Sequence, residues 1–330
     1  MNNNPEIFHE KLYDRTERKL AFSKDADYPS WREAVRRKLT ELLGMANMPE
    51  AKGAPEIRIE AQEEHPDFTE TQFQFESEPD YFVPCHLLIP KRGQKPFPVM
   101  ICLQGHSTGM HISLGETKYP KDEIHGDRDF VRHAISHGHA ALVLEQRCFG
   151  EQGCNPETGS PNCGQATMVA LLLGRTTLAG RVWDVMRAID MAEAHFSPGA
   201  QYGCMGNSGG GTVTWYAAAL EPRIAWAMPS CAICNYEGSI APIHHCVCNY
   251  VPGIRRWFEM GDLAGLIAPR PLVVVAGLTD RIFPIDATRE TFRLIQSYYA
   301  AAGAPDACRL HVGGEGHRFY AEAWEDLVAL

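Results

Sequence analysis

The sequence lacks several features that would place it outside the ordinary globular proteins. No run of about 18 consecutive apolar residues is present, so no membrane-spanning helix is expected. The N-terminus has neither a basic start nor an apolar stretch, so we expect no signal peptide and a cytoplasmic location. Positive charge is scarce, with 31 Lys and Arg against 41 Asp and Glu. Since nucleic acids are bound mainly by cationic side chains, this balance argues against a nucleic-acid partner.

The chain also lacks the cysteine pattern of a disulfide-bonded secreted protein. Its 11 cysteines are an odd number and are scattered through apolar runs and loop-like segments. Without an export signal, such a distribution favours free, buried thiols in a reducing compartment. Internal repeats and low-complexity segments are absent as well, and nothing in the sequence indicates an oligomeric state.

Helical spacing dominates the first 50 residues. Ser30 and Glu33 have the spacing of a capping box, and an apolar stripe follows at Trp31, Val35, Leu39 and Leu42. We therefore predict an N-terminal helical segment over residues 1–50, packed on the body of the protein.

The apolar pattern then changes to that of strands. Residues 56–90 alternate with a period of two, which predicts antiparallel strands. Later apolar runs are continuous, as a parallel sheet covered on both faces requires, and occupy residues 99–103, 140–144, 204–205, 224–228 and 272–276. Helical patterns separate these runs. The predicted fold class is α/β, with residues 51–330 forming a single domain around a mostly parallel central sheet with helices on both faces.

Two segments do not fit this alternation. Residues 147–176 are rich in glycine and proline, and residues 231–262 are rich in cysteine, histidine and aromatic residues. Both follow the carboxyl ends of predicted strands, where ligands bind in open α/β sheets. Loops this long usually have a function, so we expect them to be insertions over a binding site.

A nucleophile is indicated where one strand passes into a helix. Residues 206–210 read Gly-Asn-Ser-Gly-Gly and lie between an apolar strand and a helix-like segment. This strand–turn–helix setting is that of a nucleophile elbow, in which a tight turn exposes the serine. Ser208 is therefore the candidate nucleophile.

The candidate base and acid follow from chain order. A serine needs an imidazole to accept its proton, and on this fold the order along the chain is serine, acid, histidine. His317 lies in a glycine-flanked loop after the last predicted strand, whereas its nearest competitor, His311, lies within that strand. Asp280 directly follows the preceding strand and would orient the imidazole, with Asp286 as the local alternative.

Oxyanion and substrate contacts can be placed on the neighbouring loops. The backbone N–H groups of Gly209 and His106 are the expected oxyanion-hole donors. Gln104, Tyr236 and Trp257 are candidate substrate-binding residues.

Several motifs together resemble the acetyl xylan esterase-like α/β hydrolases, relatives of cephalosporin-C deacetylases and dienelactone-hydrolase-like proteins. They are Gln-Gly-His at 104–106, the elbow at 206–210, Ala-Pro-Arg-Pro at 268–271, Asp280 with Phe-Pro at 283–284, and Gly-His at 316–317. The resemblance runs from roughly residue 80 to the C-terminus. It implies the α/β-hydrolase fold and hydrolysis of small acyl esters, often acetyl groups on sugars, without a metal or organic cofactor.

This sequence departs from the family pattern at two places. Gln104 stands where many members have histidine. The segment Glu-Gln-Arg-Cys-Phe-Gly-Glu at 145–151 differs from the family's Asp-x-Arg-Gly-x-Gly, which is largely structural in the family. We therefore expect Arg147 to have a scaffold role.

Three alternatives remain open from the sequence. The same triad would serve a peptidase or amidase, although such peptidases usually carry a large partner domain. A hydrolase fold can also belong to a non-catalytic binding protein. Finally, a cysteine- and histidine-rich stretch has residue types that bind zinc, and its members are Cys231, Cys234, His244, His245, Cys246 and Cys248. The scatter of cysteines over the whole chain favours packed thiols and no metal.

Overall fold

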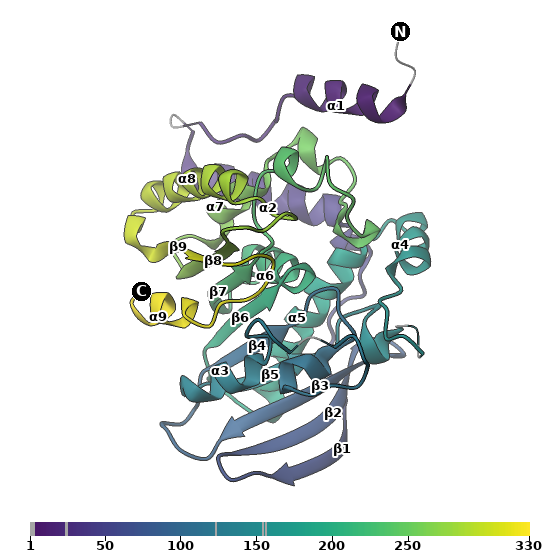
Figure 1. The fold of residues 1–330 in the computed structure, drawn as a ribbon, viewed down its shortest axis with the longest axis vertical. Coiled ribbons are helices and arrows are strands. Elements are labelled where there is room, and N and C mark those ends of the chain that lie inside the picture. The colour runs from purple at the N-terminus through teal and green to yellow at the C-terminus, as the bar shows by residue number, and fades with distance from the viewer. Residues whose placement is uncertain (1–3, 24–25, 123, 154, 156) are drawn as a thin grey trace.

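The computed structural model describes residues 4–23, 26–122, 124–153, 155 and 157–330. In this described part of the chain, the centre of the molecule is a nine-stranded sheet in the order β1-β2-β3-β5-β4-β6-β7-β8-β9. Figure 1 shows the sheet running through the molecule, with helices packed against it.

The sheet begins antiparallel and continues parallel. The three antiparallel strands β1 (Ile57–Glu64), β2 (Phe68–Glu78) and β3 (Tyr81–Pro90) pair in sequence, and β3 also pairs antiparallel with β5. The remaining strands are mutually parallel: β4 (Val99–Leu103), β5 (Ala140–Leu144), β6 (Tyr202–Asn207), β7 (Ile224–Ser230), β8 (Leu272–Gly277) and β9 (Cys308–Gly313). The predicted α/β class, with its antiparallel start, is confirmed.

Both faces of the parallel strands are covered. Along β4, Val99, Ile101 and Leu103 belong to one apolar cluster, whereas Met100 and Cys102 belong to another on the opposite face. The first cluster is completed by helices α2 (Tyr28–Leu43), α5 (Thr177–His195), α6 (Gly209–Leu220), α7 (Ala264–Ile267) and α8 (Ile285–Ala301). The second is completed by α3 (Phe130–Ser136) and α9 (Ala323–Val328). Burial on both faces explains why these strands read as continuous apolar runs.

The N-terminal segment contains two helices that differ in burial. In α1 (Pro5–Arg15) no residue is buried, and Figure 1 shows it projecting from the body. In α2 the predicted apolar stripe is buried, with Leu43 deeper than the expected Leu42. The predicted cap at Ser30 is wrong, because the helix begins at Tyr28. Asp27 is its N-cap, and the Asp27 side chain accepts a hydrogen bond from the backbone N–H of Ser30 at 3.1 Å.

The two predicted insertions contact each other. Residues 147–176 include a short 3-10 turn (Gly150–Gln152) and helix α4 (Cys163–Leu172). Residues 231–262 contain three short 3-10 turns, Tyr236–Gly238, Val247–Asn249 and Ile254–Arg256, and most of a fourth, Met260–Leu263. Helix α4 packs on the second of these turns, so the two segments form one region beside the sheet. Among the described helices, none has the length and apolar character needed to cross a bilayer.

Candidate active site

The strand order has a topological switch point at β4, where the chain reverses its direction of winding. Strand β4 pairs with β5 on one side and with β6 on the other, so the connections leaving β4 and β6 diverge. Ligands bind at this kind of switch point, beyond the carboxyl ends of the strands. The loop after β4 carries Gln104 and His106, and the turn after β6 carries Ser208.

Ser208 has the backbone conformation expected of a nucleophile elbow. Its φ of 56° and ψ of −121° lie in a region that non-glycine residues rarely adopt. A Cβ atom at Gly210 would lie 2.0 Å from the carbonyl oxygen of Leu103, so glycine is required for α6 to approach β4 this closely. The strained turn is retained because strand, turn and helix are packed around it, and it leaves the Ser208 side chain at the end of the strand.

Asp280 and His317 form the expected acid–histidine pair. The Nδ1 atom of His317 lies 2.8 Å from Oδ2 of Asp280. The other carboxylate oxygen accepts hydrogen bonds from the backbone N–H groups of Ile282 at 2.8 Å and Phe283 at 3.1 Å. Burial raises the pKa of Asp280, but the hydrogen bonds from His317 and the two amides outweigh it and hold this pKa below its ordinary value. Asp280 is thus an ionised acceptor that fixes the imidazole ring.

The two rival residues lie in other environments. His311 is within β9, and its Nδ1 atom lies 2.9 Å from a carboxylate oxygen of Asp326 on α9. Asp286 is in the first turn of α8, is almost fully exposed, and pairs with Arg289 at 3.7 Å.

The histidine loop and the elbow are held together through the end of β7. The backbone N–H of Ser208 donates to the carbonyl of Ser230 at 2.8 Å, and the Ser230 hydroxyl donates to the carbonyl of Arg318 at 3.1 Å. Arg318 is the next residue after His317. The hydrogen bonds of the described residues include none between the Ser208 hydroxyl and the His317 ring. Such contacts are often long in a ligand-free enzyme and shorten when substrate binds.

The expected oxyanion donors are neighbours. Gly209 is the first residue of α6, so its N–H has no acceptor within the helix. A Cβ atom built on Gly209 would lie 3.7 Å from the backbone nitrogen of His106 and 2.7 Å from its Nδ1 atom. Two backbone N–H groups and the positive end of a helix dipole therefore lie beside Ser208.

The three candidate substrate-binding side chains are packed in the protein. Gln104 is buried, and its Nε2 donates to Ser113 Oγ at 2.8 Å and to the carbonyl of Arg128 at 2.7 Å. Tyr236 is buried as well, with its hydroxyl 3.1 Å from that of Tyr216. Trp257 is half-buried beneath the ammonium groups of Lys19 and Lys38, which lie 4.9 and 4.1 Å from the ring centroid. These contacts favour a scaffold role for all three.

Arg147 has the contacts of a scaffold residue. Its guanidinium makes two 2.7 Å hydrogen bonds to Asp184 on α5 and a 2.7 Å ion pair with Glu78 on β2. Both carboxylates are largely buried, so the group ties the first insertion to the sheet.

Two residues lie beside His317 in a place that the sequence did not predict for them. The ring of Phe283 stacks on the His317 imidazole with centroids 6.1 Å apart. Cys231, at the end of β7, has its Sγ within 4.8 Å of ligand atoms of Asp280 and His317. Burial raises the pKa of this thiol to about 12, so it is protonated near neutral pH. The sequence had placed Phe283 in a family-like Phe-Pro motif and Cys231 in a possible zinc set, and neither signal indicated contact with His317.

The six residues considered from the sequence as a zinc-binding set do not come together in the structure. Cys231 lies beside Asp280, Cys234 is in the apolar core, and His245 Nε2 is 2.9 Å from the hydroxyl of Ser239. Only Cys246 and Cys248 approach each other, and their further neighbours come from other segments. The cysteines of the described residues are free thiols and nearly all are buried, as predicted.

Comparisons with known proteins agree with this architecture. The model of the Abhydrolase family matches residues 6–173, just over half of the chain. Putative hydrolase YtaP of Bacillus subtilis (strain 168) is 25% identical over 298 residues, which cover 86% of this chain and 92% of that protein.

Solved structures share the fold at lower identity. The crystal structure of a putative acetyl xylan esterase from Bacteroides fragilis superposes with a TM-score of 0.80 at 17% identity, covering 95% of this chain and 83% of that one. A glucuronoyl esterase from Solibacter usitatus superposes with a TM-score of 0.68 at 15% identity, covering 95% and 96%. The matched sequence model, the sheet order and these superpositions lead to one conclusion: the chain belongs to the Abhydrolase family and has the α/β-hydrolase fold.

Proposed function

We propose that this protein is a carboxylic ester hydrolase in which Ser208 is the nucleophile, His317 the general base and Asp280 the residue that orients the histidine. The observation that carries the proposal is the positive-φ conformation of Ser208 between β6 and α6, together with the 2.8 Å contact between Asp280 and His317. A strained turn of this kind is retained where function requires an exposed nucleophile.

The proposed reaction has two halves. The Ser208 hydroxyl attacks the ester carbonyl carbon while His317 Nε2 accepts its proton. The tetrahedral intermediate collapses, the C–O bond to the alcohol breaks, and His317 returns the proton to the leaving alkoxide. Water then attacks the acyl-enzyme with His317 again as base, which releases the acid and restores the serine.

The remaining groups stabilise charge that develops during these steps. With its Nδ1–H held by Asp280, the imidazole presents Nε2 as the basic nitrogen, and the carboxylate stabilises the imidazolium that forms. The backbone N–H groups of Gly209 and His106 would donate to the oxyanion, an interaction that contributes about 3 kcal/mol per donor in serine hydrolases.

The proposed substrates are small acyl esters, with acetylated carbohydrates as the first class to test. The names of the acetyl xylan esterase and glucuronoyl esterases of the same fold support esters of sugars or sugar acids. The three side chains, the two backbone donors and water supply every group that this reaction needs, so no organic cofactor enters the proposed mechanism.

Covalent labelling tests the nucleophile directly. A fluorophosphonate probe should label the wild-type protein at Ser208 and should not label Ser208→Ala. Ser297→Ala is the matched control, because Ser297 is exposed on α8 and its hydroxyl only donates to the carbonyl of Leu294. Turnover by Ser208→Ala should fall by about 10⁴-fold or more. Failure of the wild-type protein to react with the probe would favour a non-catalytic binding protein.

A substrate panel tests the reaction class. Chromogenic esters from acetyl to octanoyl, an acetylated xylo-oligosaccharide, a methyl glucuronate ester and the corresponding amides should be compared under one set of conditions. We expect turnover of acetyl esters, including the sugar acetate, and none of the amides. Faster turnover of amides than of esters would support the peptidase or amidase alternative.

A further inference from the structure

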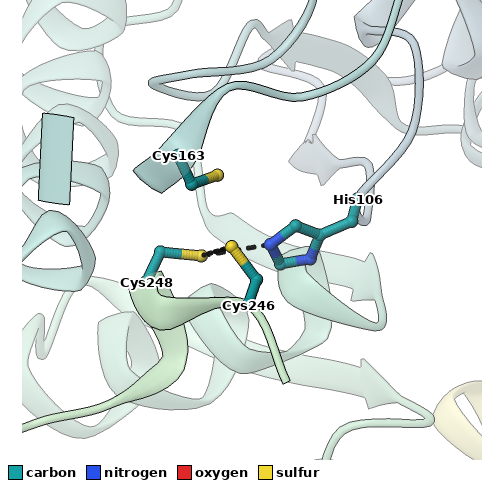
Figure 2. A group of neighbouring side chains, drawn as sticks. All are labelled: His106, Cys163, Cys246 and Cys248. Atoms are coloured by element: carbon teal, nitrogen blue, oxygen red, sulfur yellow. Dashed lines mark hydrogen bonds between the residues drawn. The ribbon is translucent and has the colours of Figure 1, made fainter. Parts of the chain in front are cut away.

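A second group of reactive side chains lies beside the elbow and takes no part in the proposed ester hydrolysis. Figure 2 shows the side chains of His106, Cys163, Cys246 and Cys248 directed toward a common centre. One ligand atom from each residue, three thiol sulfurs and an imidazole nitrogen, lies within 4.8 Å of all the others. Cys163 and Cys248 are buried, and the other two residues are partly buried.

The separations within this group are close to those in the ligand shell of a tetrahedral metal ion. His106 Nε2 lies 3.1 Å from Cys248 Sγ, and the sulfurs of Cys246 and Cys248 are 3.4 Å apart. In a zinc site, Zn–S bonds of about 2.3 Å and Zn–N bonds of about 2.0 Å place ligand atoms about 3.5–3.8 Å apart. Small side-chain adjustments would bring all four atoms to these distances.

A buried cation beside the cluster favours the thiolate forms of its cysteines. Arg181 is buried, and its guanidinium donates to Cys248 Sγ at 3.3 Å and to Cys163 Sγ at 3.5 Å. Its other hydrogen bonds go to the carbonyl of Arg147, and no carboxylate of the described residues forms an ion pair with it. Since a buried charge needs a counter-charge, thiolates at these positions would supply the partner that Arg181 otherwise lacks.

We propose that His106, Cys163, Cys246 and Cys248 bind one zinc ion. Thiolate and imidazole ligands in a tetrahedral set are the donors that structural zinc prefers. Three thiols lose their protons as the Zn–S bonds form, which gives the zinc and its ligands a net charge of −1. The guanidinium of Arg181 offsets that charge within the protein interior.

The position of the ligands assigns the ion a structural role. With four protein ligands the coordination shell is closed, so no position remains for an activated water. Cys163 begins helix α4 in the first insertion, and His106 is in the loop after β4. In the second insertion Cys246 is the N-cap of the turn Val247–Asn249 and Cys248 lies within it. The ion would therefore join both insertions to the loop beside Ser208. The proposed zinc site does not depend on the proposed esterase activity.

Elemental analysis of the full-length protein tests the proposal. The protein should be expressed in zinc-supplemented medium and purified without chelator, and its zinc measured by inductively coupled plasma mass spectrometry. We expect about one zinc per chain, retained through extensive dialysis. Cys248→Ser and Cys163→Ser should each lose most of it. Cys308→Ser is the matched control and should keep it, because Cys308 is a buried thiol on β9, outside the cluster.

A spectroscopic measurement on the wild-type protein does not depend on the folding of any variant. Replacement of zinc by Co²⁺ should give thiolate-to-metal charge-transfer bands and the intense d–d bands of tetrahedral cobalt. Absence of zinc from the wild-type protein, together with octahedral cobalt bands after titration with Co²⁺, would overturn the proposal.

Discussion

At the scale of single residues, Asp280 and Asp286 are only six positions apart in the sequence, but their contacts differ. Asp280 accepts three hydrogen bonds, one of them from His317, whereas Asp286 is exposed on the first turn of α8. Replacing Asp280 by Asn should lower kcat by about 10³- to 10⁴-fold, because an amide favours the wrong imidazole tautomer. Steady-state kinetics on an acetyl ester provides the measurement.

The matched control is Asp286→Asn, which changes the same functional group on the same connection. Its kcat should stay within about two-fold of the wild type, since it loses only a surface ion pair. A larger defect from Asp286→Asn than from Asp280→Asn would show that the acid has been assigned to the wrong residue.

Glu145 offers a test of stability against pH. It is buried after β5, and burial raises its pKa to about 7, although hydrogen bonds from the backbone N–H groups of Met110 and Glu151 oppose this shift. The folded state thus binds a proton that the unfolded chain releases at lower pH. Stability should therefore fall as pH rises from about 4.5 to about 7, with a contribution of about 3 kcal/mol.

The measurement is the urea midpoint as a function of pH for the wild type and for Glu145→Gln. We expect the urea midpoint of Glu145→Gln to fall much less than that of the wild type between about pH 4.5 and 7, because an amide does not titrate. Glu157→Gln, at an exposed position, should keep the wild-type profile. Parallel profiles for Glu145→Gln and the wild type would contradict the assignment.

At the scale of secondary-structure elements, the contact of α6 with β4 is possible because Gly210 has no side chain. A Cβ atom at Gly210 would lie 2.0 Å from a backbone carbonyl, and a backbone atom cannot move aside as a flexible side chain can. Gly210→Ala should therefore destabilise the fold by about 3 kcal/mol or more and displace the elbow. Chemical denaturation with activity measured in parallel tests both effects.

Helix α4 supplies the control for that prediction. Gly164 also lies in a helix, but a Cβ there would meet no atom within 4 Å. Gly164→Ala should be neutral or should stabilise by up to about 1 kcal/mol, because alanine loses less backbone entropy in a helix. Equal losses of stability in the two variants would falsify the close-approach argument.

At the scale of the whole molecule, the two N-terminal helices differ in what they contribute to folding. Helix α1 has no buried residue, whereas α2 buries Trp31, Val35, Leu39 and Leu43 in the main core. The indole of Trp31 stacks on Tyr298 of α8 with centroids 5.0 Å apart. Within α1, Tyr13 packs against that core, and its ring lies under the Arg255 guanidinium at 4.4 Å. We therefore propose that α2 is part of the hydrolase body and that only the part of α1 before Tyr13 is a separable segment.

Two truncations test this division. Removing residues 1–12, which keeps Tyr13 and Thr16 and their contacts with Arg255, should change the thermal midpoint by no more than about 2 °C. Removing residues 1–43 should prevent stable folding, because four buried apolar side chains contribute about 6–12 kcal/mol, comparable with the whole free energy of folding. A stable product of the longer truncation would show that α2 is dispensable.

Much of the fold and of the candidate site could be predicted because their signals are local. Strands buried on both faces require continuous apolar runs, and the predicted runs at 99–103 and 140–144 coincide with β4 and β5. The elbow depends on a few glycines around Ser208, and the placement of Asp280 and His317 after successive strands brings them together at one edge of the sheet. The start of α2 was mispredicted because Asp27 and Ser30 are both good caps, and local sequence does not decide between them.

The amino-acid sequence by itself therefore determined the α/β class, the strand positions and the candidate catalytic residues, since each follows from spacing within one element or from chain order. Only the tertiary structure decided the strand order, with β5 between β3 and β4, and the convergence of His106, Cys163, Cys246 and Cys248. His106 and Cys248 are separated by 142 positions yet lie 3.1 Å apart. The physical reason is that the two insertions lack a regular apolar period, so the packing of one against the other alone decides which of their thiols meet.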